Sequence, residues 1–380
     1  MRIAVPAETA PLETRVAIVP RSVAQLTKAG ATLAVQAGAG EAAGIADAAY
    51  SETGAEIERD RTRLLSGGDL TVVVRRPPLE DLRRLKEGSV IVGMIDPGRD
   101  AESLRLLADR KITAFRMEAL PRISRAQDMD VLSSQATLGG YHAAVMAAYR
   151  LPRIFPLLMT AAGTITPARA LVLGAGVAGL QAIATCRRLG AVVEAYDVRP
   201  AVREQVESLG ARFIDVGIES EAQQDAGGYA KELTADAQAR EHEVVSQHVK
   251  DSDVVITTAF VPGRPAPVLI TRDMVEGMRP GSLIVDLAAA AGGNCELTKP
   301  DEEVDANGVC VLGPTNLPAA VPGQASQLYS HNVTRFLLQI VKDGEISLDF
   351  DDVVIAQTCM THDGEPRGEQ MTALLSGAAK

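Results

Sequence analysis

The stretch that decides the fold is Leu171-Val-Leu-Gly174-Ala-Gly176-Val-Ala-Gly179-Leu-Gln-Ala. An apolar run leads into it and a helical pattern leads out, which is typical of a strand–turn–helix that binds a dinucleotide. Gly174 would make the tight turn, Gly176 would let the backbone approach the pyrophosphate, and Gly179 would let helix pack on strand. Val177 and Ala178 would open the helix, where N–H groups and the helix dipole favour phosphate.

An acidic residue follows this fingerprint at the expected distance. Ala191-Val-Val-Glu-Ala-Tyr-Asp197 reads as a second strand whose last residue lies about 20 positions after Gly176. A carboxylate there accepts both adenosine-ribose hydroxyls and repels a 2′-phosphate, so we expect NAD(H) rather than NADP(H). Val198 and Arg199 follow, and the guanidinium of Arg199 would soften that preference. The alternative is that Asp197 only caps the helix beginning near Pro200.

Strand and helix patterns alternate on both sides of the fingerprint, which predicts two α/β domains. In the first third, buried parallel strands are expected at Ile3–Val5, Thr32–Gln36, Thr71–Val74, Val90–Val92 and Ile112–Phe115. In the second set, strands are expected at Ala170–Leu173, Val192–Asp197, Arg212–Val216, Val254–Thr257, Leu283–Asp286 and Val309–Leu312.

Two long helical segments, about Val131–Arg150 and about Gln324–Val341, flank the second set, and Val353–Thr358 reads as a further strand. We therefore expect two doubly wound Rossmann-like domains, one inserted into the other and joined by the two long helices. Residues 1–132 and 328–380 would form the discontinuous first domain, and residues 133–327 would form the NAD(H)-binding domain.

Composition narrows the classes of function. The 380 residues are 46% hydrophobic, enough for two cores, and the net charge of −11 disfavours binding to nucleic acid or anionic lipid. The four cysteines are scattered without a C-x-x-C pair, so we expect a reducing compartment and no metal site. Charge appears soon after the start, and glycine or proline interrupts each uncharged run, so neither a signal peptide nor a membrane span is expected.

A polar segment, Pro121-Arg122-Ile-Ser-Arg125-Ala-Gln127-Asp-Met-Asp130-Val-Leu-Ser133-Ser134-Gln135, precedes the first long helix. Its guanidinium, amide, carboxylate and hydroxyl groups suit the nicotinamide carboxamide, which needs donors and acceptors to fix the ring face. An equally good interpretation is that Asp130 caps the helix and the arginines are solvated. The residues alone leave both open.

Four further segments are candidates for the nucleotide site. The polar stretch Gly217–Arg240 contains Gly227-Gly228-Tyr229 and would be either a lid with a stacking tyrosine or a surface insertion. Thr258, Ala259 and Phe260 follow the fourth strand of the second set, at the edge where dinucleotides bind. Asp286–Asn294 and Thr315–Pro318 occupy comparable positions. The five histidines fall mostly in expected helices, so an obvious general base is lacking.

Together these motifs resemble the alanine dehydrogenase and transhydrogenase family, and within it the NAD(H)-binding components of proton-translocating transhydrogenases. The resemblance runs from Arg2-Ile-Ala-Val-Pro to about Thr361. Its most specific pieces are PRISRAQDMDVLSSQ, GAGVAGLQAIATCRRLGA, GGYAKEL, PGRPAPVLIT and DLAAAAGGN.

The resemblance implies roles for particular residues. Arg122, Gln127, Asp130 and Ser133 would surround the nicotinamide and face a partner, and Tyr229 would lie on a mobile loop over the nucleotide. It also implies a homodimer that works with a membrane-embedded subunit and an NADP(H)-binding subunit. The chain would then be cytoplasmic, held at the inner (plasma) membrane by those partners, and would pass hydride from NADH to NADP⁺.

The alternatives are an alanine-type amino-acid dehydrogenase and a non-catalytic NAD(H) sensor. Arg15 could hold a small carboxylate. However, alanine dehydrogenases carry a histidine in the segment Val90–Asp96 and an aspartate in Leu287–Ala291, and this chain has neither. Arg75 and Arg76 stand where the dehydrogenases use lysine. Hydride transfer between two nicotinamides exchanges no proton with a side chain and tolerates these differences.

Overall fold

The computed structural model describes residues 1–98, 100–217, 234–260 and 265–377. Tyr229 and most of the expected lid lie outside the described residues. The chain forms two compact units, residues 1–135 with 319–380 and residues 136–318. The sequence prediction divides the chain at slightly different places, 132/133 and 327/328. Within the described parts, none of the helices has the length and apolar content needed to cross a membrane.

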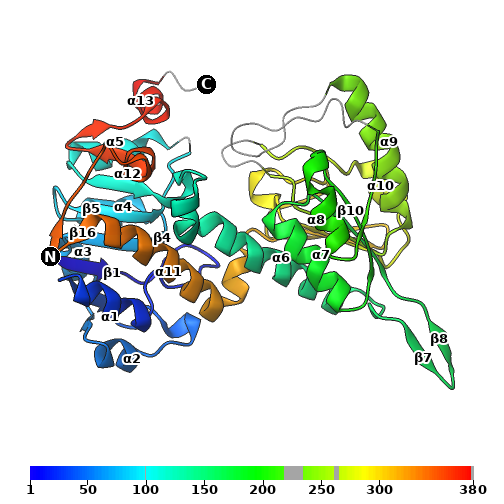
Figure 1. Cartoon of the computed structure of the whole chain (residues 1–380), viewed down its shortest axis with the longest axis horizontal. Helices are drawn as coiled ribbons and strands as arrows, with labels where there is room; N and C mark the ends of the chain where they lie inside the picture. The colour runs from blue at the N-terminus through cyan, green and yellow to red at the C-terminus, as the bar shows by residue number, and fades with distance from the viewer. Residues whose placement is uncertain (99, 218–233, 261–264, 378–380) are drawn as a thin grey trace. The chain divides into compact units, whose positions relative to one another are not determined.

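The first unit is built on an eight-stranded sheet in the order β19-β18-β6-β5-β4-β1-β2-β3 (Figure 1). Strands β1 to β6 are parallel, and β18 and β19 are added antiparallel at one edge. The strands are β1 (Arg2–Val5), β2 (Thr32–Gln36), β3 (Glu56–Glu58), β4 (Leu70–Arg75), β5 (Val90–Met94), β6 (Thr113–Arg116), β18 (Cys359–His362) and β19 (Glu365–Pro366). The parallel strands read 3-2-1-4-5-6, the doubly wound order.

Helices cover both faces of this sheet because alternate strand residues point to opposite faces. Val72 and Val92 belong to one core with helices α1 and α11, and Val73 and Ile91 belong to another with α4 and α5. The helices are α1 (Pro20–Lys28), α2 (Asp47–Glu52), α3 (Arg61–Gly67), α4 (Leu79–Arg84), α5 (Ala101–Asp109), α11 (Pro322–Ile340), α12 (Val353–Thr358) and α13 (Glu369–Ser376). A small hairpin, β16 (Val341–Lys342) and β17 (Glu345–Ile346), follows α11.

One strand prediction is wrong. Val353–Thr358 forms helix α12 rather than a strand, and the strand is the following segment, Cys359–His362. The reason is a local cap: the Asp352 side chain accepts a hydrogen bond from the Val354 N–H and starts the helix. The β-branched run Val-Val-Ile is therefore helical, because a capping residue precedes it, although β-branched residues favour strands. The predicted strand at Arg212–Val216 is also shorter than expected, ending at Phe213.

The second unit contains a seven-stranded sheet in the order β11-β10-β9-β12-β13-β15-β14, parallel except for β14. Its strands are β9 (Arg169–Leu173), β10 (Val192–Tyr196), β11 (Arg212–Phe213), β12 (Val254–Thr257), β13 (Leu283–Asp286), β14 (Glu303–Ala306) and β15 (Val309–Leu312). Taken in chain order, the first five parallel strands and β15 again read 3-2-1-4-5-6. The ends of β9 and β12 therefore flank the switch point where dinucleotides bind in such sheets.

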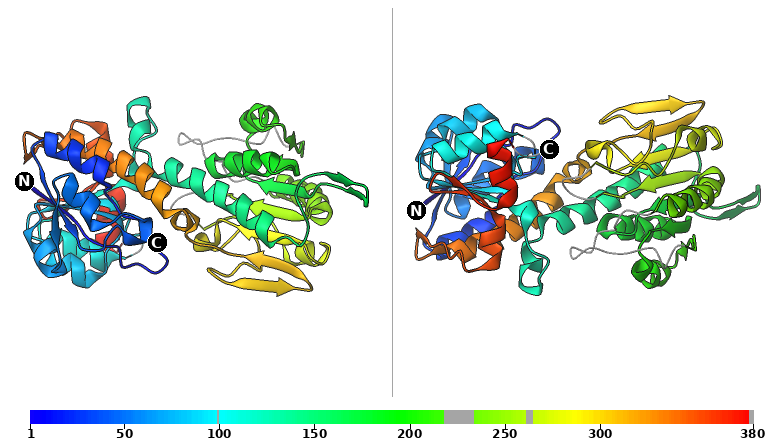
Figure 2. Two further views of the ribbon diagram at one scale, coloured as in Figure 1. Left: turned by 90° about the horizontal axis from the view of Figure 1, so that it is seen from below. Right: turned by 90° about the horizontal axis from the view of Figure 1, so that it is seen from above.

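One hydrophobic core covers each face of this second sheet. Val172 and Ile256 pack with α6, α7 and α8 on one face, and Leu171 and Val255 pack with α9 and α10 on the other. The helices are α6 (Val131–Arg150), α7 (Val177–Arg188), α8 (Arg203–Ser208), α9 (Ala235–Asp251) and α10 (Arg272–Glu276). A separate hairpin, β7 (Leu158–Thr160) and β8 (Gly163–Ile165), extends from this unit as an arm (Figures 1 and 2).

Helix α6 begins in the first unit and continues without a break into the second (Figure 2). The sequence prediction has the chain return from the second unit to the first through a second long helix, and the structure differs. The return crossing falls within the short helix η6 (Leu317–Ala320), just before α11 begins.

Helix α6 meets α7 through a contact that excludes side chains. A Cβ atom built at Gly140 would lie 2.0 Å from the carbonyl oxygen of Ala178. At the neighbouring Gly139, the same atom would lie 3.9 Å from a Pro318 side-chain carbon, an ordinary van der Waals distance. Two adjacent helical glycines therefore have opposite packing requirements.

Gly140→Ala should lower the free energy of unfolding of the second unit by about 1–3 kcal/mol, because α6 and α7 must move apart. Gly139→Ala is the matched control and should be neutral or stabilising by up to about 1 kcal/mol, because alanine favours the helix and has room. Chemical denaturation followed by circular dichroism measures both. Equal effects of the two substitutions would contradict the packing argument.

Candidate dinucleotide-binding site

The fingerprint glycines adopt the geometry that their spacing predicts. Gly174 follows β9 with φ +96°, and a Cβ there would lie 2.6 Å from the Thr258 hydroxyl oxygen. At Gly179, a Cβ would lie 1.9 Å from the Gly174 carbonyl oxygen, so α7 packs directly on the turn. Both positions therefore require glycine for steric reasons, the first also because of its left-handed backbone.

Gly176 differs from the other two glycines because the described residues leave the space around it open. A Cβ at this position would meet only one described atom within 4 Å, Nη2 of Arg199 at 3.9 Å. Gly176 is the N-cap of α7, and Val177 and Ala178 form the first turn of the helix. Helix N–H groups thus face a space that admits a close backbone–phosphate approach.

The Asp197 carboxylate lies at the end of β10 and is only 7% exposed. Its Oδ2 accepts hydrogen bonds from the Ala175 N–H at 2.7 Å and from Nη2 of Arg199 at 2.8 Å. Its Oδ1 accepts from the backbone N–H and the Nε of Arg199, both at 2.9 Å. Asp197 thus links the fingerprint turn to β10. Val198 is half-buried beside it.

These bonds bear on the two interpretations of Asp197. It bonds the backbone of Arg199, which is itself the N-cap of the short helix at Pro200–Val202, so Asp197 does not cap a helix. A carboxylate accepts about four hydrogen bonds, and four are present. A ribose hydroxyl would therefore reach Asp197 by replacing one of the Arg199 bonds.

The segment after β12 lies at the same edge of the sheet as the fingerprint turn. The Thr258 hydroxyl donates to the Gly174 carbonyl at 2.9 Å, and the backbone of Ala259 is hydrogen-bonded to the Asn294 side chain. Phe260 is 45% exposed. The structure thus brings together the predicted residues after β9, β10 and β12, as expected for carboxyl ends of parallel strands.

Two residues of the candidate segment Asp286–Asn294 complete this edge. Asp286 and Asn294 are fully buried, and Asp286 accepts the Asn294 N–H at 2.7 Å. Their position after the fifth strand was visible in the sequence. Their hydrogen-bond partners were not, because those partners lie on three other segments.

The polar segment before α6 lies in the first unit and forms the helix η3 (Ser124–Met129). Arg122 and Gln127 are exposed. Asp130 does cap α6: its Oδ1 accepts the Ser133 N–H at 2.9 Å, and its Oδ2 accepts the Ser133 hydroxyl at 2.6 Å. The capping interpretation of Asp130 is therefore confirmed, and the nicotinamide role of these four residues stays a prediction.

Arg125 is anchored in this segment. Its two terminal nitrogens donate to the two carboxylate oxygens of Asp352 at 2.9 and 2.6 Å. This fork-to-fork pair ties η3 to the N-cap of α12. The side chain nevertheless stays 47% exposed, so the interpretation of Arg125 as a solvated side chain holds, with Asp352 as its ion-pair partner.

Arg15 is buried within the first unit. It is 2% exposed, its Nε and Nη2 donate to the Glu13 carboxylate at 2.7 and 2.6 Å, and its Nη1 donates to Oε1 of Gln135 at 2.8 Å. Every arm of its guanidinium thus has a partner within the protein. A substrate carboxylate would have to displace one of these buried bonds.

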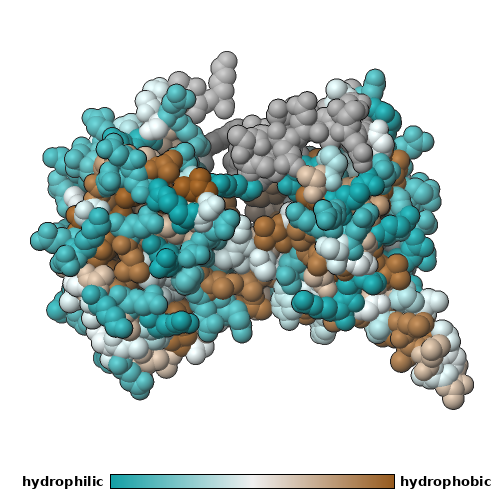
Figure 3. Space-filling view, in the orientation of Figure 1, coloured by the Kyte–Doolittle hydropathy of each residue, from teal (hydrophilic) through white to brown (hydrophobic). Residues whose placement is uncertain are grey.

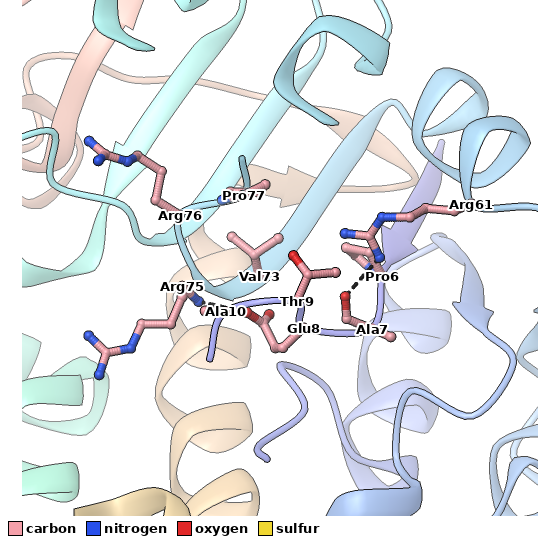
Figure 4. Close-up of a pocket in the computed structure, with 10 residues that line it drawn as sticks. All are labelled: Pro6, Ala7, Glu8, Thr9, Ala10, Arg61, Val73, Arg75, Arg76 and Pro77. Carbon is pink, nitrogen blue, oxygen red and sulfur yellow. Dashed lines mark hydrogen bonds between the residues drawn. The ribbon is translucent and has the colours of Figure 1, made fainter. Parts of the chain in front are cut away.

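A small hollow next to this cluster is lined by Glu8, Arg61 and Arg75, among others (Figure 4). The Glu8 carboxylate accepts the backbone N–H groups of Val74 and Arg75 at 2.6 and 3.1 Å. Burial raises the pKa of Glu8 to about 7 despite these donors, and the nearby Glu13 acts in the same direction. The volume of the hollow, about 10 Å³, is that of a water-sized group rather than an amino acid.

Burial likewise raises the pKa of Glu118 to about 7, with the Asp96 carboxylate adding to the effect.

His142 and His331 lie in long helices, and His362 contacts Thr113 on the antiparallel edge of the first sheet. Among the described residues, no group of His, Cys, Asp and Glu side chains is arranged to hold a metal ion.

Comparisons with known proteins agree on one family. The domain descriptions "Alanine dehydrogenase/PNT, N-terminal domain" and "Alanine dehydrogenase/PNT, C-terminal domain" match residues 4–139 and 143–368. The chain is 46% identical over 372 residues to the first part of NAD(P) transhydrogenase subunit alpha of Rhodospirillum rubrum, covering 96% of this chain and 97% of that protein. It is 30% identical to an alanine dehydrogenase of Halomonas elongata, covering 96% and 94%.

Solved structures give the same result. A transhydrogenase from Sinorhizobium meliloti superposes with a TM-score of 0.87 at 41% identity, covering 96% of this chain and all of that one. An L-alanine dehydrogenase superposes with a TM-score of 0.82 at 23% identity, which shows the shared fold. The chain belongs to the alanine dehydrogenase/PNT family.

Proposed function

We propose that this chain is the NAD(H)-binding alpha subunit of a proton-translocating NAD(P)⁺ transhydrogenase and presents NADH for hydride transfer to NADP⁺ on a partner subunit. The observation that carries the proposal is the dinucleotide edge of the second unit. There, among the described residues, only Arg199 lies within 4 Å of a Cβ built at Gly176, the N-cap of α7, and the Asp197 carboxylate accepts the N–H of the adjacent Ala175. Identity of 40–46% to proteins named as transhydrogenase alpha subunits supports the choice within the family.

Each part of the chain has a separate task in this proposal. The N-terminus of α7 holds the pyrophosphate, and Asp197 binds the adenosine ribose after one Arg199 bond is released. Arg122, Gln127, Asp130 and Ser133 orient the nicotinamide, and Tyr229 lies over the bound nucleotide. The hydride leaves C4 of NADH with its electron pair and reaches C4 of NADP⁺, so NAD⁺ and NADPH form.

This reaction requires orientation rather than acid–base catalysis. Because no proton passes to a side chain, the absence of a histidine in Val90–Asp96 does not obstruct it. Oxidation of an amino acid requires a base and a free cation for the carboxylate. The bonds of Arg15 to Glu13 and Gln135 therefore favour hydride exchange over alanine oxidation.

The proposal includes partner subunits, one embedded in the membrane and one that binds NADP(H). The chain would lie on the cytoplasmic side of the inner (plasma) membrane, held there by those subunits, and proton translocation would belong to the membrane subunit. The Rhodospirillum rubrum relative is named as one part of a subunit alpha, which supports an assembly of several chains.

We also propose that two copies of the chain form a homodimer through the β7–β8 arm. An isolated two-stranded hairpin is marginally stable in water. This one exposes Leu157, Leu158, Met159 and Ile165 by 43–71%, and Figure 3 shows apolar residues along the arm. A second copy would cover these side chains, as large exposed apolar surfaces usually require.

The function is tested by mixing the chain with the NADP(H)-binding component of a transhydrogenase. We expect the chain alone to bind NADH and to catalyse no rapid reaction. In the mixture, hydride should pass between NADPH and an NAD⁺ analogue with a distinct absorbance, because the second nicotinamide must come within about 3–3.5 Å. Rapid alanine-dependent reduction of NAD⁺ by the pure chain would overturn the proposal in favour of a dehydrogenase.

Arg122→Ala should slow hydride transfer at saturating NADH by about 10- to 100-fold, because a misplaced ring loses its near-attack geometry. NADH affinity should change less than about twofold, since pyrophosphate and ribose contacts supply most of the binding. The exposed Arg105 on α5 is the matched control, and Arg105→Ala should change neither quantity. Equal losses of rate and affinity would remove Arg122 from its orienting role.

Met159→Asp should convert the homodimer of 40.0 kDa chains to monomers, because it places a charge on the most exposed apolar side chain of the arm. Leu12→Asp, at a 59% exposed position in the first unit, is the control and should leave the dimer intact. Light scattering after size exclusion measures the mass. A monomeric unsubstituted chain, or a dimeric Met159→Asp variant, would contradict the proposed arm contact.

A further inference from the structure

Asn294 is fully buried, and its side chain bonds to the backbone of the segment that follows β12. Its Oδ1 accepts the Ala259 N–H at 3.0 Å, and its Nδ2 donates to the Ala259 carbonyl at 2.8 Å. The same Nδ2 also donates to the Pro267 carbonyl at 2.8 Å. One amide therefore satisfies both polar groups of Ala259 and joins that residue to Pro267.

The Asn294 side chain is itself held in place by Asp286 at the end of β13. The Asp286 carboxylate is fully buried and accepts the backbone N–H groups of Asn294 and Cys295 at 2.7 and 3.1 Å. It also accepts the hydroxyls of Thr257 and Thr298 at 2.8 and 2.6 Å. With these donors satisfied, the buried carboxylate fixes the backbone from which Asn294 extends.

The network continues from Ala259 to the fingerprint turn. Thr258, adjacent to Ala259, donates its hydroxyl to the Gly174 carbonyl at 2.9 Å. Gly174 in turn donates its N–H to the Tyr196 carbonyl at 2.8 Å, next to Asp197. Hydrogen bonds thus connect β13 through the segment after β12 to the turn after β9.

The strand order shows which half of the nucleotide this segment serves. In a 3-2-1-4-5-6 sheet, one set of three strands binds each mononucleotide, and Asp197 assigns the adenosine to the β9-β10-β11 set. The segment after β12 then belongs to the nicotinamide mononucleotide. We propose that Asn294 is a positioning residue that fixes Thr258 and Ala259 for binding of the nicotinamide half of NAD(H).

This inference rests on the proposed function, since it assumes that NAD(H) is the nucleotide bound. It goes beyond it by separating the two halves of the site. The Asn294 side chain bonds Ala259 and Pro267, whereas Asp197, the proposed partner of the adenosine ribose, bonds Ala175 and Arg199. Replacement of Asn294 should therefore weaken binding of one half of the ligand and leave the other unchanged.

The test compares NADH with 5′-AMP, which occupies only the adenosine half, by calorimetric titration. Asn294→Ala should weaken NADH binding about tenfold and change 5′-AMP binding less than about twofold. Ser252→Ala is the matched control: it deletes a buried side-chain hydrogen bond of the same unit, to the His248 carbonyl, before β12 rather than after it, and NADH affinity should stay within about twofold of the unsubstituted chain. Thermal denaturation checks that both variants fold.

If Asn294→Ala does not fold, Asn294→Asp carries the same comparison, because it keeps the shape and the acceptor but lacks the two donated bonds. A parallel fall in NADH and 5′-AMP affinity, or an unchanged NADH affinity, would overturn the inference. Failure of the unsubstituted chain to bind NADH would instead contradict the proposed function.

Discussion

The close packing of α7 on the turn after β9 is the constraint on which the second unit depends. A side chain at Gly179 would place its Cβ 1.9 Å from the Gly174 carbonyl oxygen, so the helix and the turn touch backbone to backbone. This contact directs the N-terminus of α7 across the carboxyl ends of the strands. It also leaves the space around Gly176 open, with Arg199 the one described residue near it. The shape of this strand edge therefore depends on the absence of a side chain at Gly179.

Buried carboxylates complete the same edge by bonding backbone N–H groups. Asp197 holds Ala175 and Arg199, and Asp286 holds Asn294 and Cys295. The burial of a carboxylate is costly unless its lone pairs are satisfied, so each acid fixes the loops around it in one arrangement. The strand ends are therefore connected to one another before any ligand binds, which reduces the entropy lost on binding.

The two units have the same order of parallel strands but differ at the switch point. In the second unit the turn after β9 is glycine-rich, and the described residues leave the space beside it open. In the first unit the turn after β1 carries Glu8, whose carboxylate accepts the N–H groups of Val74 and Arg75 at the end of the neighbouring β4. The end of this strand is thus already bonded by the protein's own buried side chain. The same strand order therefore carries a glycine-rich turn in the second unit and a buried carboxyl group in the first.

The sequence by itself determined the fold class, the fingerprint and its acid. These are local properties: the strands bury apolar residues on both faces, and the glycine spacing is set by one turn and one helix. It also determined the extent of α6, whose start is marked by Asp130 a few residues before a long helical pattern. At Val353–Thr358 the β-branched run predicts a strand, whereas the Asp352 cap favours a helix. The strand prediction was wrong, because the helix forms.

Only the tertiary structure decided which polar side chains are available and which are already bonded. Arg15, Arg125, Arg199 and Asn294 look alike in sequence as polar residues near candidate segments. In the fold, Arg15 is bonded to Glu13 and Gln135, Arg125 to Asp352, Arg199 to Asp197 and Asn294 to Ala259. Several of these partners are distant in sequence: Arg125 and Asp352, for example, are 227 positions apart. Such pairings arise when the sheets assemble, because residues distant along the chain then meet at neighbouring strand ends, and no local pattern records them.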